Sequence, residues 1–233
     1  MEAKSAENGD RAAQGGVRPR DRYHHGDLRN ALIEAATGLA REGGPGAVVL
    51  RAAARRVGVS PTAAYRHFEG QADLLDEVKQ YGQRHLAETM VEAGAAIEGE
   101  GPEAAVARIR ALGRGYVRFA VREPGLFSTA FGGTEMTPLV VGEGESGGVD
   151  PEDQPWRAPA FDMLAASLDA LLACGLMPPE RRPGAEVSAW AMAHGLATLV
   201  LEGPLAGLPA DTFERLVERA LSDLVAGLTA PVS

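Results

Sequence analysis

Cysteine is nearly absent from this chain of 233 residues, because Cys174 is the only one. An internal disulfide and a cysteine-rich zinc site are therefore both excluded. Cys174 has the pattern of a small buried apolar residue on a helix, and a catalytic thiolate would need a nearby histidine that no spacing reveals. No second histidine or cysteine stands at metal-ligand spacing from His194, so neither a metal nor a cofactor is expected.

Long apolar runs are missing as well. No stretch approaches the roughly 20 apolar residues needed to cross a bilayer, and the N-terminus leads into polar sequence instead of an apolar signal core. We therefore expect no membrane partner and a cytoplasmic location. Residues 1–21 lack periodicity and large apolar side chains, which predicts a disordered leader. The apolar fraction of 45% is nevertheless enough for a globular core.

Positive charge is scarce overall. The formal net charge is -9, which by itself argues against a nucleic-acid partner. Its distribution reverses this conclusion, because residues 18–68 hold nine arginines and four acidic residues, 9 - 4 = +5, and the remainder carries -9 - 5 = -14. A basic N-terminal module on an acidic body can present one face to phosphates and repel them elsewhere.

Apolar periodicity predicts helices throughout and no alternating strand, so the expected fold class is all-α. We expect a three-helix helix-turn-helix DNA-binding domain over residues 22–71, followed by a helical ligand-binding and dimerisation domain over 72–233. Residues 132–157, rich in Gly, Glu, Asp and Pro, predict a long mobile loop. Asp211 and Glu214 have the spacing of a capping box at the start of the last helix. About nine helices are expected, near residues 27–39, 50–57, 61–68, 72–97, 102–122, 126–131, 161–172, 185–202 and 211–228.

The second and third predicted helices carry the functional signal. Residues 58–61 interrupt the helical pattern between them. Ser60 is expected to cap the third helix, and Pro61 suits its first position. A short exposed third helix can enter a major groove, where small side chains approach base edges and polar ones bind phosphates. Alternatively, residues 58–61 join two core helices; Val57 and Phe68 pack inside in either case. The candidate DNA-binding residues are Arg22, His24, Arg51, Ser60, Thr62, Ala63, Ala64, Tyr65, Arg66 and His67.

This segment resembles a known family. Gly58-Val59-Ser60 followed by Tyr65-Arg66-His67-Phe68 is similar to the DNA-binding segment of TetR-family regulators, and Trp190 to Gly195 resembles the Trp-x-x-x-His-Gly signature of one of its C-terminal domain classes. Two positions depart from the family. Val49 replaces the usual Ser or Thr before the second helix, and Gln71 replaces a phosphate-binding Lys. The arm residues would then have to compensate for the missing cap and phosphate contact; these are Arg18, Arg20, Arg22 and His24.

The resemblance implies a DNA-binding transcription regulator that acts as a homodimer. The eighth and ninth helices would pair as a four-helix bundle and hold two recognition helices over a palindromic operator; both helices also carry more apolar surface than one small core can hide. A small apolar or amphipathic effector would bind in the body and shift the fourth helix. A repressor released by its effector is the function expected, while an activator stays open.

Large side chains in the body are the candidate effector contacts, although each could equally be plain core. His194 lies one turn after Trp190 on the same helical face, and Gly195 permits close helix contact; a hydrogen-bonded structural histidine is the alternative to a ligand contact. The candidates are Phe127, Phe131, Met136, Trp156, Phe161, Met163, Trp190 and His194.

Two other classes of function stay open. For a small enzyme, residues 142–148 offer a glycine-rich stretch, but the preceding strand, the lysine and the following helix of a phosphate loop are missing, and no catalytic set can be named. A helical adaptor without DNA binding would be recognised by its failure to bind duplexes at low salt.

Overall fold

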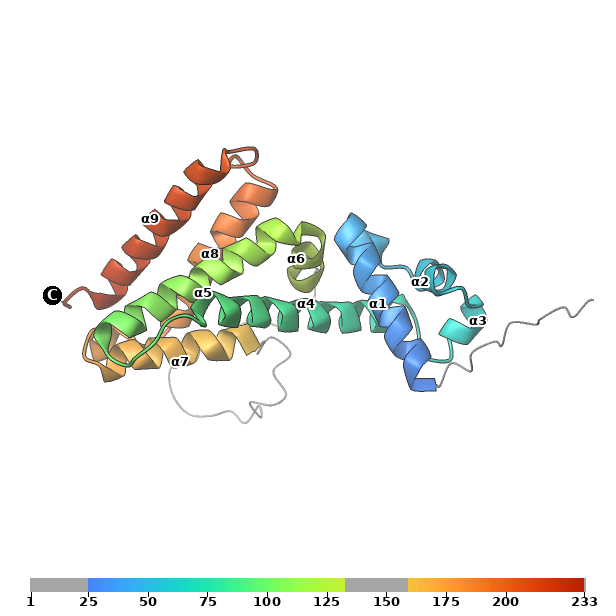
Figure 1. The fold of residues 1–233 in the computed structure, drawn as a ribbon, viewed down its shortest axis with the longest axis horizontal. Coiled ribbons are helices and arrows are strands. Elements are labelled where there is room, and N and C mark those ends of the chain that lie inside the picture. The colour runs from blue at the N-terminus through green and yellow to red at the C-terminus, as the bar shows by residue number, and fades with distance from the viewer. Residues whose placement is uncertain (1–24, 133–158, 233) are drawn as a thin grey trace, which may run out of the picture.

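The computed structural model describes residues 25–132 and 159–232, and within these ranges every regular element is helical (Figure 1). The predicted all-α fold is therefore confirmed. The predictions of a disordered leader over 1–21 and of a loop over 132–157 concern residues that, apart from Gly132, lie outside the described ranges. The helices are α1 (His25–Gly43), α2 (Leu50–Val57), α3 (Pro61–Ala64), α4 (Gln71–Gly94), α5 (Pro102–Arg122), α6 (Pro124–Phe131), α7 (Pro159–Ala173), α8 (Ala185–Leu201) and α9 (Ala210–Thr229), with short 3₁₀ turns η1 (Pro45–Ala47) and η3 (Pro179–Arg181).

Helices α1 to α3 form a small head at one end of the molecule, and α5 to α9 form a larger body (Figure 1). Helix α4 runs from the head into the body, where it packs against α5, α6 and α7. Helix α5 lies between α4 on one side and α8 and α9 on the other. No helix within the described ranges is long and apolar enough to cross a membrane.

One apolar core continues from the head into the body through α4. Leu74 and Val78, in the first turns of this helix, are fully buried in the core of the head. Leu86 and Met90, two turns further on, are buried among the body helices. The stripe that repeats every three or four residues along α4 therefore joins the two parts mechanically.

Helices α3 and α4 end three or four residues before the predicted ends, and α9 begins without the predicted capping box. Helix α3 stops at Ala64 because the next amides bond at i−3 spacing, His67 N–H to the Ala64 carbonyl at 2.9 Å, so residues 65–67 form a tight turn. Helix α4 stops at Gly94 instead of residue 97. The capping box of α9 is also wrong: the Pro209 carbonyl accepts the first helical bond, and Asp211 binds Arg215 at 2.8 Å.

Candidate DNA-binding face and body cavity

The connection between α2 and α3 has the geometry of a helix-turn-helix. Gly58 ends α2 with φ 81°, a left-handed conformation that glycine adopts without steric cost. Two residues later the Ser60 hydroxyl accepts a hydrogen bond from the Ala63 N–H at 3.2 Å, which confirms the predicted cap. Val49 provides no side-chain cap for α2, because its apolar side chain has no hydrogen-bond acceptor.

The exposed side of α3 and its following turn carries most of the candidate DNA-binding side chains. Thr62, Tyr65 and Arg66 are exposed, with 48% of the Tyr65 surface accessible. His67 and Ala63 are half-buried. The predicted DNA contact of Ala64 must be corrected, since Ala64 is fully buried in the head core and its methyl group cannot approach a base edge. Phe68, 1% exposed, packs in that core as predicted.

Ion pairing divides the arginines of the head into two groups. Arg29, Arg41 and Arg56 each pair with a glutamate, Glu77, Glu123 and Glu42 respectively, at N–O distances of 2.5–2.8 Å. Arg51, Arg55 and Arg66 are exposed and have no ion pair within the described part of the chain. Arg55 was missed in the sequence, although its position one turn after Arg51 on α2 places both on one helical face.

The paired arginine Arg29 stabilises the head itself. Its guanidinium lies 2.6 Å from the Glu77 carboxylate on α4 and 5.1 Å above the centre of the Phe68 ring. These contacts tie α1 to α4 and to the turn after α3. The role of Arg29 is therefore to hold the recognition segment in place.

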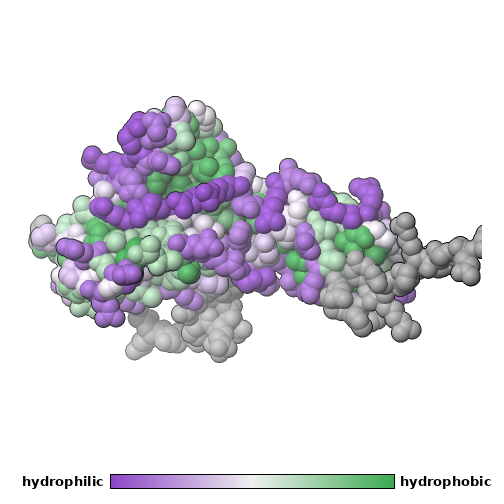
Figure 2. All heavy atoms as spheres, viewed as in Figure 1, coloured by the Kyte–Doolittle hydropathy of each residue, from purple (hydrophilic) through white to green (hydrophobic). Residues whose placement is uncertain are grey.

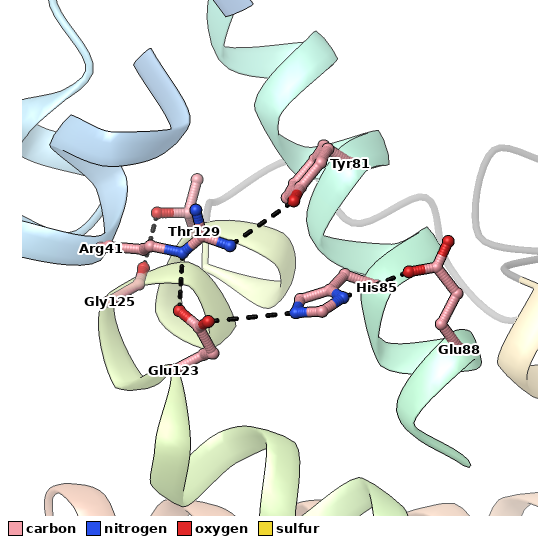
Figure 3. Close-up of polar contacts among 7 residues, drawn as sticks. All are labelled: Arg41, Tyr81, His85, Glu88, Glu123, Gly125 and Thr129. Atoms are coloured by element: carbon pink, nitrogen blue, oxygen red, sulfur yellow. Dashed lines mark hydrogen bonds and ion pairs between the residues drawn. The ribbon is translucent and has the colours of Figure 1, made fainter. Parts of the chain in front are cut away.

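The head touches the body through a polar network around Glu123, at the junction of α5 and α6 (Figure 3). Arg41 of α1 donates to the Glu123 carboxylate at 2.8 Å and to the Tyr81 hydroxyl at 3.5 Å. His85 of α4 has one ring nitrogen 3.9 Å from Glu123 and the other 3.2 Å from Glu88. Burial acts to lower the pKa of Arg41, but the hydrogen bonds to Glu123 and Tyr81 outweigh it and raise that pKa.

Backbone also meets backbone at this junction. Gly125, in the first turn of α6, faces the last carbonyls of α1 so closely that an added Cβ would lie 2.7 Å from the Arg41 carbonyl oxygen and under 3 Å from that of Ala40. Thr129 fixes the same turn by donating to the Gly125 carbonyl at 2.7 Å (Figure 3). The contact between α1 and α6 therefore requires glycine at this position.

The body encloses an apolar cavity of about 30 Å³ between α4, α5, α7, α8 and α9. Its wall includes Leu112, Tyr116, Leu164 and Trp190, and no charged side chain among the described residues lines it. A site that encloses a drug-sized ligand measures roughly 300–1,000 Å³. The described conformation must therefore open before such a ligand can enter.

An aromatic cluster adjoins the cavity and shares Tyr116 and Trp190 with it. Five of the eight predicted effector residues meet there, with neighbouring ring centres 5.1–5.9 Å apart: Phe127, Phe131, Phe161, Trp190 and His194. Met163 instead packs against the main core from α7. Met136 and Trp156, like the arm residues Arg22 and His24, lie outside the described ranges.

Tyr116 and His194 form the polar centre of this cluster. The Tyr116 hydroxyl lies 2.8 Å from Nδ1 of His194, and only 5% of the Tyr116 surface is exposed. Burial raises the pKa of Tyr116 and lowers that of His194, so both groups are uncharged at neutral pH. Tyr116 was missed as a candidate, although its place in the apolar stripe of α5, with Ile109 and Leu112, could have indicated it.

Ring contacts connect the cluster to the junction with the head. Phe127 lies 5.4 Å from His194 and 6.4 Å from Phe119, and Phe119 lies 5.7 Å from His85, which faces Glu123. The distances are between ring centres and span packed edge-to-face or tilted pairs. A displacement at His194 can thus be transmitted to Glu123 by direct contact. Among the described residues no three potential ligands gather to hold a metal ion.

Two family models match the chain. Residues 32–78 match a model described as bacterial regulatory proteins of the tetR family. Residues 109–224 match a model described as the tetracyclin repressor-like C-terminal domain. No curated protein matches.

Solved structures resemble the chain over most of its length. A protein with unknown function from Rhodococcus sp. RHA1 is 28% identical, with 90% of this chain and 100% of that chain covered and a TM-score of 0.70. A transcriptional regulator of the TetR/AcrR family from Thermobifida fusca YX-ER1 is 20% identical, with coverage of 86% and 98% and a TM-score of 0.55. A bacterial regulatory protein in the tetR family from Rhodococcus RHA1 is 17% identical, with coverage of 88% and 98% and a TM-score of 0.55. The last two likenesses show the fold alone.

Proposed function

Because this chain belongs to the TetR family of DNA-binding transcription regulators, we propose that it is a repressor that a small-molecule effector releases from a palindromic operator. Members of this family bind DNA as dimers and are not enzymes, so the enzyme and the adaptor without DNA binding are set aside. We assign DNA binding to residues 22–71, and effector binding and dimerisation to residues 72–233.

The unpaired arginines of the head carry the proposal. Arg51 and Arg55 on α2 and Arg66 after α3 are exposed and lack ion pairs within the described ranges, although the chain as a whole has a net charge of -9. Unpaired guanidinium groups beside a helix-turn-helix are suited to phosphate contacts. Tyr65 and Thr62 are exposed in and just after α3 and would bind phosphates or base edges, while Ser60 acts by capping α3.

We propose that α8 and α9 form the dimer interface. Within one chain α8 buries a single stripe of alanines, and Val187 and Leu199 are 38% and 41% exposed, so part of its apolar surface stays uncovered in the monomer. Leu216 of α9 is 39% exposed. Figure 2 shows hydrophobic surface over these two helices. A second copy would cover it, which also suits Gly195, because a Cβ there would meet no atom of its own chain.

We propose that the effector enters the cavity and the neighbouring aromatic cluster. The cavity of about 30 Å³ is far too small for such a ligand, so binding must move α5, α6 or α8. The described conformation is then the one that favours the operator, and effector binding disfavours it. Phe127 and Phe119 would carry the movement to His85 and Glu123, and from there to Arg41 of the head.

The test starts with duplexes selected by the full chain from a random pool. Affinity for the selected duplex would be measured by fluorescence anisotropy at several salt concentrations. Arg51→Gln should weaken binding and reduce the slope of log affinity against log salt by about 0.9, the value for one phosphate contact. Tyr65→Ala should weaken binding as well.

Arg118 on α5 supplies the matched control. It is exposed and has no ion pair within the described part of the chain, but it lies in the body, so Arg118→Gln should leave affinity and slope unchanged. A selected duplex without two-fold symmetry, or equal slopes for Arg51→Gln and the parent, would contradict the proposal.

A further inference from the structure

We infer that the effector of this protein is an uncharged, flat aromatic molecule whose single hydrogen-bond acceptor binds Nε2–H of His194. This inference rests on the proposed function, because it takes the cavity and the aromatic cluster as the effector site.

The proton positions of the Tyr116–His194 pair follow from burial. The pair is 2.8 Å apart, and neither residue has another hydrogen-bond partner among the described residues. If Nδ1–H donated to the tyrosine oxygen, the buried Tyr116 O–H would be left without an acceptor, which is costly. Tyr116 O–H therefore donates to Nδ1, and the neutral imidazole carries its proton on Nε2.

Nε2–H of His194 is then left without a protein partner among the described residues, and because it is not one of their buried unpaired atoms it remains accessible to water or to a ligand. Phe127 and Phe131 lie 5.4 Å and 5.7 Å from the imidazole, centre to centre, and provide no acceptor for Nε2–H. A ligand with a ring nitrogen or a carbonyl oxygen satisfies this donor, whereas a pure hydrocarbon leaves it unpaired. The hydrogen bond thus selects one class of aromatic ligand over another of the same shape.

The surroundings exclude charge. The cavity wall includes no Asp, Glu, Lys or Arg among the described residues. A carboxylate placed there would lose its hydration without gaining a cationic partner, because His194, which lies beside the cavity and not in its wall, has a pKa that burial lowers from 6.5 and is neutral at pH 8. The flat rings around it, including Phe131 and Trp190 at 5.9 Å, favour a planar ligand that packs edge-to-face or offset.

The burial of each ring indicates which side chains would move when a ligand enters. Tyr116 and Phe127 are each 5% exposed and held by neighbours on several sides, whereas Phe131, Phe161 and Trp190 are only half-buried. A two-ring ligand would therefore enter by displacing the half-buried rings and would leave the Tyr116–His194 hydrogen bond intact.

Three probes of nearly equal shape test the inference by equilibrium dialysis against the full chain at pH 8, without DNA. These probes are isoquinoline, which has a ring-nitrogen acceptor, naphthalene, which has none, and 2-naphthoate, which is an anion. Isoquinoline should bind about fivefold more tightly than naphthalene, as one net hydrogen bond provides. 2-Naphthoate should bind at least about tenfold more weakly than naphthalene.

Two variants identify the donor. His194→Phe should remove the preference for isoquinoline while naphthalene still binds, and Tyr116→Phe should reduce the preference because the imidazole can then place its proton on either nitrogen. His85→Gln, a histidine outside the cluster, should keep the parent ratio. Circular dichroism melting would establish that each variant is folded.

The inference is overturned if naphthalene and isoquinoline bind equally to the parent, if 2-naphthoate binds most tightly, or if none of the three binds. Duplex binding by the same preparation separates this failure from that of the proposed function. A chain that binds its selected duplex but lacks the ratio remains a regulator with a different ligand. A chain that keeps the ratio but binds no duplex supports the pocket chemistry and refutes the proposed repressor.

Discussion

Replacing Gly125 by alanine should weaken operator binding while the protein stays folded. The added Cβ would lie 2.7 Å from the Arg41 carbonyl oxygen, whereas ordinary contact begins at 3.4 Å, so α1 and α6 must separate by at least 0.7 Å, the difference between these two distances. Both clashing atoms of α1 are backbone oxygens, which no side-chain rotation can remove. The head must therefore tilt relative to the body.

The size of the effect follows from the cost of overpacking. Inserting one methyl group at a close contact costs about 1–3 kcal/mol. If the variant relieves this strain by moving the head, the same free energy opposes the operator-bound arrangement and lowers affinity by roughly 5–150-fold. Fluorescence anisotropy with the selected duplex would measure this loss, and circular dichroism would show that the helices remain.

Gly46 offers the matched control for this substitution. It lies in η1 of the same head, and a Cβ there would meet no atom within 4 Å, so Gly46→Ala should leave operator affinity unchanged. Equal affinities of Gly125→Ala and Gly46→Ala would refute the reasoning, because the contact between α1 and α6 would then have no influence on the recognition helices.

Three further predictions concern stability. Burial lowers the pKa of His194 in the folded chain, so as the pH drops below the ordinary value of 6.5 the unfolded chain binds a proton at this residue before the folded chain does. The free energy of unfolding should therefore fall below pH 6.5. Urea unfolding at pH 7.5 and 5.5 should show a smaller fall for His194→Phe than for the parent. Arg29→Ala removes the contacts with Glu77 and Phe68 and should lower the free energy of unfolding by about 1 kcal/mol, whereas the exposed, unpaired Arg55 should tolerate the same change in a thermal melt. Leu86→Ala empties a fully buried position and should cost about 2–5 kcal/mol in urea unfolding; a loss below 1 kcal/mol would show that α4 is not packed as described.

The helices and the head could be predicted from the sequence because local signals decide them. Gly58, Ser60 and Pro61 define the turn by their backbone and capping preferences, and the structure confirms each role. The burial of Ala64 was not predicted, because a four-residue helix has too few turns to show which side faces the core. Alanine also occurs both in cores and at surfaces, so its identity alone does not predict its burial.

The body site was only partly predictable for a different reason. Phe127, Trp190 and His194 could be nominated by their size and motif, but their meeting with Tyr116 depends on how α5 packs against α6 and α8. Trp190 and His194 stand 74 and 78 residues after Tyr116 in the sequence. The pairing of Arg41 with Glu123 spans 82 residues and likewise leaves no local periodicity. Such contacts arise from tertiary packing alone.

The shared core along α4 has a consequence for anyone who exchanges parts of such regulators. Leu74 and Val78 fill the head, yet they stand after residue 71, on the same rod as Leu86 and Met90. A chimera that joins the body of another regulator at residue 72 would remove two core residues from the head. A junction placed after Val78 would transfer the head together with these two core residues.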